Sequence, residues 1–289
     1  MLEFLVNPKK AERRPWEMLI IGFFYAAISV AIATFLFYRN PTLEKYSSIF
    51  IVMFTTIFSI PFMYFLIKLE EKKELRIKEE KTLIEEHGKA LSALLFLFLG
   101  FTIAFALAFI LMPQGLVDVS FKAQLETYCS INPGDTKNCE GITGAVTGDN
   151  IKTGLGGVSS ILANNLLVMI TILIFSLLFG AGAIFILAWN ASVIGVAMGL
   201  FSKGSIINMP SSLLRYMIHG IPEIAAYFVA ALAGGIISVA IIKHEFGKKQ
   251  FWRVMRDSLD LIIIAVVILI IAAILEVFLT PAIMSLVGA

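Results

Sequence analysis

Two groups of ionisable residues interrupt apolar stretches near the end of the chain. Arg215, His219 and Glu223 open one apolar stretch, and Glu276 lies near the end of the next. An ionisable side chain in a lipid-spanning helix is costly, so it persists where it faces a protein interior or a water-filled cavity. These residues therefore predict a structural or functional site within a membrane.

His219 and Glu223, one helical turn apart on the face of Arg215, could act with Glu276 in three ways. They could bind a cation, relay protons, or form a hydrogen-bonded clasp that fixes the register of two helices. The sequence has no His-Glu-x-x-His, no Gly-x-Ser-x-Gly and no clustered set of cysteines and histidines. We therefore expect no enzyme activity, no catalytic residue, no metal and no cofactor.

The elements that position these residues are apolar helices. Hydrophobic residues make up 58% of the chain, against roughly 45–50% with glycine included in ordinary soluble domains. A helix needs about 20 apolar residues to cross a hydrocarbon core. Windows of that length predict an all-α, polytopic transmembrane bundle with spans near residues 17–38, 47–67, 90–112, 161–187, 213–242 and 258–279, and a weaker seventh span at 191–207.

Loop charges favour seven crossings over a re-entrant segment at 191–207. With seven crossings and a cytoplasmic N-terminus, 16 of the 23 lysines and arginines lie on the cytoplasmic side, whereas a re-entrant segment leaves 13 there. The positive-inside rule prefers the first arrangement, which places the C-terminus outside the cell membrane. The net charge of +2 gives no reason to expect nucleic-acid binding.

Small residues share helix faces with the polar ones, which predicts an inward-facing polar seam. Asn164 and Asn165 open the fourth span, at a depth similar to that of Glu223 and Glu276. Small residues let helices approach closely in membranes, and Pro222 predicts a kink because it removes a backbone donor. The predicted polar cluster is Asn164, Asn165, Arg215, His219, Glu223 and Glu276, and the packing or kink positions are Gly195, Gly199, Gly220, Pro222, Gly234 and Gly235.

The long loop at 113–160 is predicted to lie outside the cell and carries both cysteines, Cys129 and Cys139. An external location permits a disulfide. It would close a short loop around residues 132–135, Asn-Pro-Gly-Asp, which form turns readily. The alternative is two unpaired thiols.

Residues 68–89 contain seven basic and seven acidic residues and predict a charged cytoplasmic helical arm, either solvated or docked to a partner. The expected organisation is an N-terminal two-span segment with this arm (1–89), a membrane core (90–281) and a short tail (282–289). The expected partners are the lipid bilayer and envelope or membrane proteins that contact loop 113–160 or the arm. Gly195 and Gly199 could serve a homo-oligomer contact as well as internal packing.

Several spaced motifs occur together between residues 90 and 281. They are Asn164-Asn165, Gly180-Ala181-Gly182, Trp189-Asn190 with Gly195, His219-Gly220-Ile221-Pro222-Glu223 before Gly234-Gly235, and Leu275-Glu276-Val277-Phe278-Leu279-Thr280-Pro281. This set resembles the stage II sporulation protein M family. The resemblance implies an all-helical membrane core and, from the sporulation members, a scaffold that acts with cell-wall-degrading partners. The first two spans and the cysteine-bearing loop lie outside the shared motifs.

The leading expectation is therefore a non-enzymatic membrane scaffold of the cell envelope that organises partner proteins or membrane shape. In that case the polar seam acts as a clasp between helices. The alternative is an ion- or proton-coupled transporter or channel whose Asn, His and Glu residues line a pathway. The sequence shows no inverted repeat, which favours the scaffold.

Overall fold

The computed structural model describes residues 8–37, 40, 42–74, 83–131, 139, 155–202, 207, 209–242, 249–280 and 282–283. Within these ranges the chain is helical and contains no strand. In the same ranges seven helices are long and apolar enough to cross a membrane, which confirms the all-α polytopic prediction. They are α3 (Glu17–Phe37), α4 (Ser47–Glu74), α5 (Leu83–Leu111), α9 (Leu155–Phe179), α10 (Ala183–Phe201), α11 (Met209–Ile242) and α12 (Lys249–Ile274), which continues into the π-helical η3 (Leu275–Leu279).

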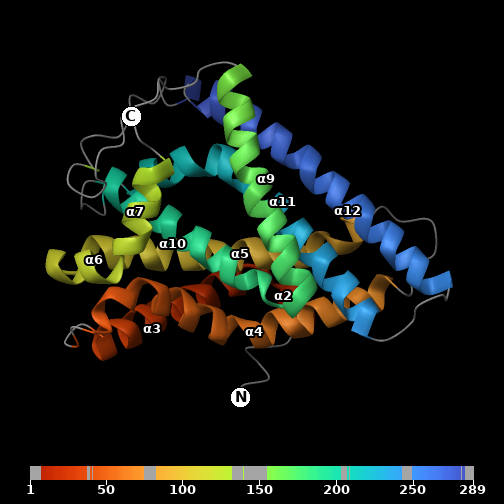
Figure 1. The fold of residues 1–289 in the computed structure, drawn as a ribbon, viewed down its shortest axis with the longest axis horizontal. Coiled ribbons are helices and arrows are strands. Elements are labelled where there is room, and N and C mark those ends of the chain that lie inside the picture. Colours follow the sequence, from red (N-terminus) through yellow and green to blue (C-terminus); the bar gives the residue numbers. More distant parts are fainter. Residues whose placement is uncertain are drawn as a thin grey trace.

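Most consecutive long helices run in roughly opposite directions, while α9 crosses α5 steeply (Figure 1), and short helices mark two faces of the molecule. One face, called here the α7 face, carries the short helices α6 (Gln114–Ser120) and α7 (Lys122–Ile131). The other, the α2 face, carries α2 (Pro8–Arg13), which packs on α4 and α5. α11 is the central helix, because 83% of its apolar window is buried, against 22% for α9 and 28% for α12.

The boundary between the fourth and fifth spans differs from the prediction of 161–187 and 191–207. α9 ends at Phe179 and α10 begins at Ala183. Gly180 between them has a φ of +58°, a left-handed conformation that favours glycine and commonly ends a helix. The turn contains no charged residue, so hydropathy alone does not reveal it. α10 is a continuous helix of 19 residues, long and apolar enough to cross a membrane.

The first two spans share one apolar core with the rest of the described chain. α3 and α5 approach closely at two glycines, Gly22 and Gly100. A Cβ atom added to Gly100 would lie 2.7 Å from the backbone nitrogen of Phe23, and one added to Gly22 would meet the carbonyl of Leu97. Close packing of this kind makes α3 an integral part of the helical bundle.

The segment predicted as an outer loop, 113–160, is partly helical. α6 and α7 form its first part, and α9 begins at Leu155 within its last part. The α6–α7 layer is fixed to the start of α4 by Ser48. The Ser48 hydroxyl donates to the carbonyl of Val119 at 3.4 Å and accepts from the amide of Ala123 at 3.3 Å. The Ser48 carbonyl accepts from the Gln124 side chain at 3.2 Å.

Cys129 and Cys139 form the disulfide that the sequence analysis predicted. The disulfide is buried with Tyr128 against Ala197 of α10. It links α7 covalently to residue 139 and packs this pair on α10, while the turn predicted at 132–135 lies outside the described residues.

The charged segment 68–89 differs from the predicted solvated arm. Residues 68–74 form the end of α4 and residues 83–89 the beginning of α5, while 75–82 lie outside the described residues. Glu70 and His87 are buried. Both side chains belong to a polar network, described below, which explains how charged residues enter the interior.

Candidate functional site

A cavity of about 750 Å³ lies among α5, α7, α9, α10, α11 and η3. It reaches from the α7 face into the bundle, because its wall includes Tyr128 of α7 as well as Thr171 of α9. Thr171 lies about 22 Å along the span that begins at Gly156, at a rise of 1.5 Å per residue. The polar side chains in the wall with the most potential for chemistry are Asn164, Asn165, Asn190, Glu223, Tyr227 and Glu276.

Glu223 lines the cavity from α11, a helix that continues through Pro222. Proline lacks an amide proton, so one carbonyl of the preceding turn loses its usual helical partner. The Glu223 carboxylate accepts a hydrogen bond from the Tyr227 hydroxyl at 2.9 Å and another from the Asn165 side chain. Tyr227 and Asn165 are buried. Neighbours on two helices therefore hold Glu223 in position.

Glu276 lines the same cavity from the π-helical η3. Thr280 closes this wide turn, since its hydroxyl donates to the carbonyl of Leu275 at 3.2 Å. π-Helical turns are rare and occur frequently at functional sites. No described residue donates a hydrogen bond to the Glu276 carboxylate or forms an ion pair with it. Its charge does act on Glu223, so the two carboxylates form one electrostatic site.

The asparagines of the cavity present acceptor oxygens. Asn164 uses its amide nitrogen to donate to Asn165 Oδ1 at 3.4 Å, and Asn190 uses its own to donate to the carbonyl of Ile186 at 2.8 Å. Oδ1 of Asn164 and Oδ1 of Asn190 are thereby left as acceptors. Within the described residues, no group of three or more His, Cys, Asp or Glu side chains could hold a metal ion.

The structure brings four of the six predicted polar residues together, since Asn164, Asn165, Glu223 and Glu276 all line the cavity. Arg215 and His219 belong to α11, but their side chains lie outside the described part of the chain. Sequence reasoning missed several polar wall residues. Tyr227 could have been found because it follows Glu223 by one helical turn, and the others include Trp189, Asn190 and Thr171.

Gly195 and Gly199 of α10 face α5. A Cβ atom on Gly195 would lie 2.7 Å from Cβ of Phe105, and one on Gly199 would meet the ring of Phe109. This face of α10 is therefore occupied within the chain. Gly220 differs, because a Cβ atom there would meet nothing within 4 Å.

The bundle is tightly closed between the cavity and the α2 face. A Cβ atom on Gly234 would lie 2.8 Å from Cβ of Ser176, and one on Gly235 would lie 2.9 Å from Cδ1 of Ile67. Ser176 also donates a hydrogen bond of 2.6 Å to the carbonyl of Ala231. α11 thus packs directly on α9 and α4 in this half of the molecule.

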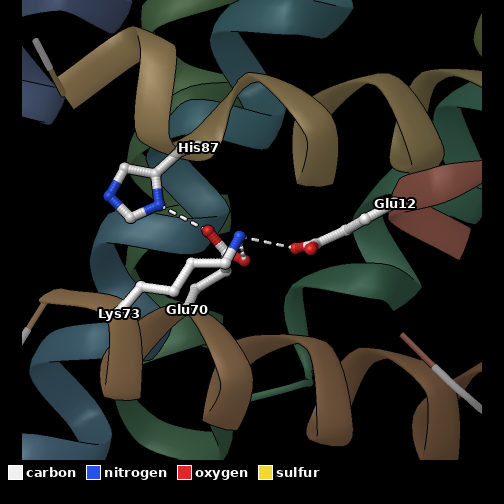
Figure 2. A network of polar contacts seen from close by, with 4 residues as sticks. All are labelled: Glu12, Glu70, Lys73 and His87. Carbon is white, nitrogen blue, oxygen red and sulfur yellow. Dashed lines mark hydrogen bonds and ion pairs between the residues drawn. The ribbon is translucent and has the colours of Figure 1, made fainter. Parts of the chain in front are cut away.

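A second polar site, absent from the sequence-based predictions, lies at the α2 face (Figure 2). Lys73 Nζ lies 2.6 Å from Glu12 Oε1 and 2.7 Å from Glu70 Oε1, and His87 Nδ1 lies 2.6 Å from Glu70 Oε2. The side chains of Glu70 and His87 are 0% and 1% exposed. This network joins α2, α4 and α5, and its residues are too far apart in sequence for a local pattern to reveal it.

Two groups of this network lie outside the membrane-spanning segments and titrate abnormally. Burial, together with the neighbouring Glu70 carboxyl, raises the pKa of the Glu12 carboxyl despite the nearby Lys73 ammonium. Burial also acts to lower the pKa of Lys73, but its hydrogen bonds to Glu12 and Glu70 outweigh this effect and leave that pKa raised. Two neighbouring carboxyl groups in a largely buried site do not ionise together readily, so Glu12 retains a proton more readily than an isolated acid would.

Comparisons with known proteins cover the part of the chain that forms the cavity. The family model described as stage II sporulation protein M matches residues 90–281. An uncharacterized protein of Methanocaldococcus jannaschii is 35% identical over 127 residues, which cover 42% of this chain and 70% of that protein. No solved structure matches the chain significantly. The family match spans well over half of the 289 residues, and the chain therefore belongs to the stage II sporulation protein M family.

Proposed function

We propose that this chain is a non-enzymatic membrane transport protein of the ion- or proton-coupled class, with its central binding site in the polar cavity. The observation that carries the proposal is the cavity itself, which has Glu223 and Glu276 in its wall. A purely structural clasp would bring its polar groups into mutual contact and would leave no space of this size. The proposal therefore ranks the alternative of the sequence analysis above the scaffold.

The helices around the site support this choice. Transporter sites commonly lie near the middle of the bilayer, where interrupted helices offer backbone and side-chain groups to the substrate. Here Pro222 interrupts the hydrogen bonding of α11 beside Glu223, and η3 replaces the regular α-helix at Glu276. Irregular backbone at membrane depth is tolerated where it lines a cavity.

The energetic argument concerns Glu276. An intramembrane carboxylate is costly unless it meets water, a counter-ion or a hydrogen-bond donor. Glu276 has no such partner among the described residues, and it lines a cavity that could supply one. Water or a ligand in the cavity would lower the energetic cost of the Glu276 carboxylate.

The cavity reaches one face of the molecule and not the other in this state. It begins at α7, while the contacts of Gly234 and Gly235 with α9 and α4 close the α2 side. Transport would require a second state in which these contacts separate and the α7 side closes. By the positive-inside rule the α7 face lies outside the cell, so the described state would be open to the exterior.

A second candidate is a scaffold of the cell envelope, as the family resemblance implies. It is favoured by the α6–α7 layer, which hydrogen bonds of Ser48 fix to α4 and which packs on α10 around the disulfide. Such a fixed layer could present a surface to envelope or membrane proteins. The scaffold requires neither an accessible cavity nor solute movement, so flux separates the two candidates.

The test is ion flux in proteoliposomes under an imposed pH gradient, with protons and potassium followed separately. Wild-type protein is compared with the double variant Glu223→Gln/Glu276→Gln and with Glu126→Gln, an exposed glutamate of α7 outside the cavity wall. We expect flux from the wild type and from Glu126→Gln, and none from the double variant if it stays monodisperse. Absence of flux in all three proteins would favour the scaffold.

A further inference from the structure

We infer that the cavity binds an amphipathic organic cation, with its ammonium group between Glu223 and Glu276. This inference rests on the proposed function, because it takes the cavity as the binding site, and it adds the chemical class of the ligand. It follows from the charge, the hydrogen-bonding capacity and the size of the cavity.

The charge of the wall favours a cation. Glu223 and Glu276 come from two different helices and are coupled electrostatically. None of the described residues in the wall is Lys, Arg or His. Among the described wall residues, an anionic ligand would meet two carboxylates and no positive charge, whereas a cation would relieve their mutual repulsion.

The hydrogen-bonding groups also favour a ligand that donates. Oδ1 of Asn164 and Oδ1 of Asn190 accept no hydrogen bond from the described residues, while each amide nitrogen already donates one of its two N–H groups within the protein. The Glu276 carboxylate has no described donor, and a carboxylate offers about four lone-pair sites. An ammonium group has three donors and no acceptor, which complements a wall of this kind.

The size and the apolar part of the wall exclude a bare metal ion as the best fit. A volume of about 750 Å³ falls within the range of roughly 300–1,000 Å³ that is usual for small-molecule sites. Val168, Ile194 and Ile224 add apolar surface, and Trp189 adds an aromatic ring. Aliphatic groups could pack on the former, and a cation gains from the face of an indole ring.

The same chemistry could come from a dissolved amine or from the amine headgroup of a lipid. The experiment therefore uses the full chain in nanodiscs of phosphatidylglycerol, which has no amine, and measures the unfolding temperature with butylammonium. Butyrate, 1-butanol and potassium chloride at equal concentrations are the matched anionic, neutral and ionic probes. A ligand that binds the folded state raises the unfolding temperature with its concentration.

We expect butylammonium alone to raise the unfolding temperature, with an affinity unchanged in Glu126→Gln. Loss of one charge-assisted hydrogen bond in Glu276→Gln should weaken binding about tenfold or more, and Glu223→Gln provides a second test if Glu276→Gln fails to fold. A rise in discs that contain phosphatidylethanolamine, lost in these variants, would support the same site with a lipid as the source.

Equal stabilisation by butyrate or 1-butanol would overturn the cationic class while leaving ligand binding intact. No stabilisation by butylammonium or phosphatidylethanolamine would overturn the inference altogether. Either failure is distinguishable from failure of the proposed function, because proton and potassium flux are measured without any amine present.

Discussion

Replacement of Lys73 by methionine tests whether the network at the α2 face is as important as its burial implies. The substitution keeps most of the aliphatic volume and removes an ammonium that lies 2.6 Å from Glu12 Oε1 and 2.7 Å from Glu70 Oε1. Its side chain is 20% exposed, and those of Glu12 and Glu70 are 12% and 0% exposed. The change would therefore leave two carboxyl groups near each other in a largely dry environment.

The expected cost follows from the burial of the partners. Removing one member of a buried ion pair typically costs about 3–5 kcal/mol, because the other charge stays buried and unpaired. Protonation of Glu12 would relieve part of this cost, so we expect the loss in unfolding free energy to be about 3 kcal/mol. An exposed ion pair contributes only about 0–1 kcal/mol.

The chain offers a matched control in Arg14, whose guanidinium lies 3.3 Å from Glu17 and is 65% exposed. The assay is equilibrium unfolding in mixed detergent and dodecyl sulfate micelles, followed by the loss of helicity. Arg14→Met should cost less than about 1 kcal/mol. If Lys73→Met costs as little as Arg14→Met, the network is not a buried electrostatic unit and the reasoning is wrong.

Three further predictions concern the same fold. Because the pKa of Glu12 is raised in the folded protein, ionisation of this carboxyl opposes folding. The free energy of unfolding of the wild type should therefore increase as pH falls from neutral toward 4.5. Unfolding titrations of Glu12→Gln should lack this part of the pH dependence. Gly100→Ala would force α3 and α5 apart and should lower the free energy of unfolding by about 1–3 kcal/mol in the same assay. Gly115→Ala is the control and should not lower it, because a Cβ atom there meets nothing within 4 Å. Reduction of the Cys129–Cys139 disulfide should lower stability by about 3 kcal/mol in the chain-entropy model, and an unchanged midpoint with reductant would contradict a stabilising role.

The sequence predicts the bundle well because apolar windows of membrane length are a strong signal. It also predicts that Glu223 and Glu276 approach each other, since consecutive antiparallel helices bring the start of α11 and the end of the last helix to one face. The helix break at Gly180 was misplaced because the turn around it is as apolar as its flanks. Local hydropathy carries no information about a left-handed φ in such a segment.

The polar network at the α2 face could not be predicted from the sequence, because its residues are far apart along the chain. Glu70 and His87 look like members of a solvated charge run, and Glu12 lies in a separate basic segment. Their contact depends on how α2, α4 and α5 pack. The cavity is similar, because its volume depends on the spacing of six elements. Asn190 and Tyr227 taken singly resemble ordinary residues of apolar helices.

Water access to the cavity is the most direct measurement of the central claim. Thr171 lines the cavity, whereas the adjacent Ile170 is 49% exposed and lies outside the wall. Both native cysteines form the disulfide, so a cysteine introduced at either position can be labelled without background. The reagent is a membrane-impermeant trimethylammonium methanethiosulfonate, applied to oriented proteoliposomes from the side that carries α7.

The account predicts that Thr171→Cys is labelled from the α7 side and is protected by butylammonium. Ile170→Cys, at nearly the same depth but facing lipid, should stay unlabelled. Equal resistance of both cysteines to the reagent would contradict a water-accessible cavity in the membrane and, with it, the proposed site of transport.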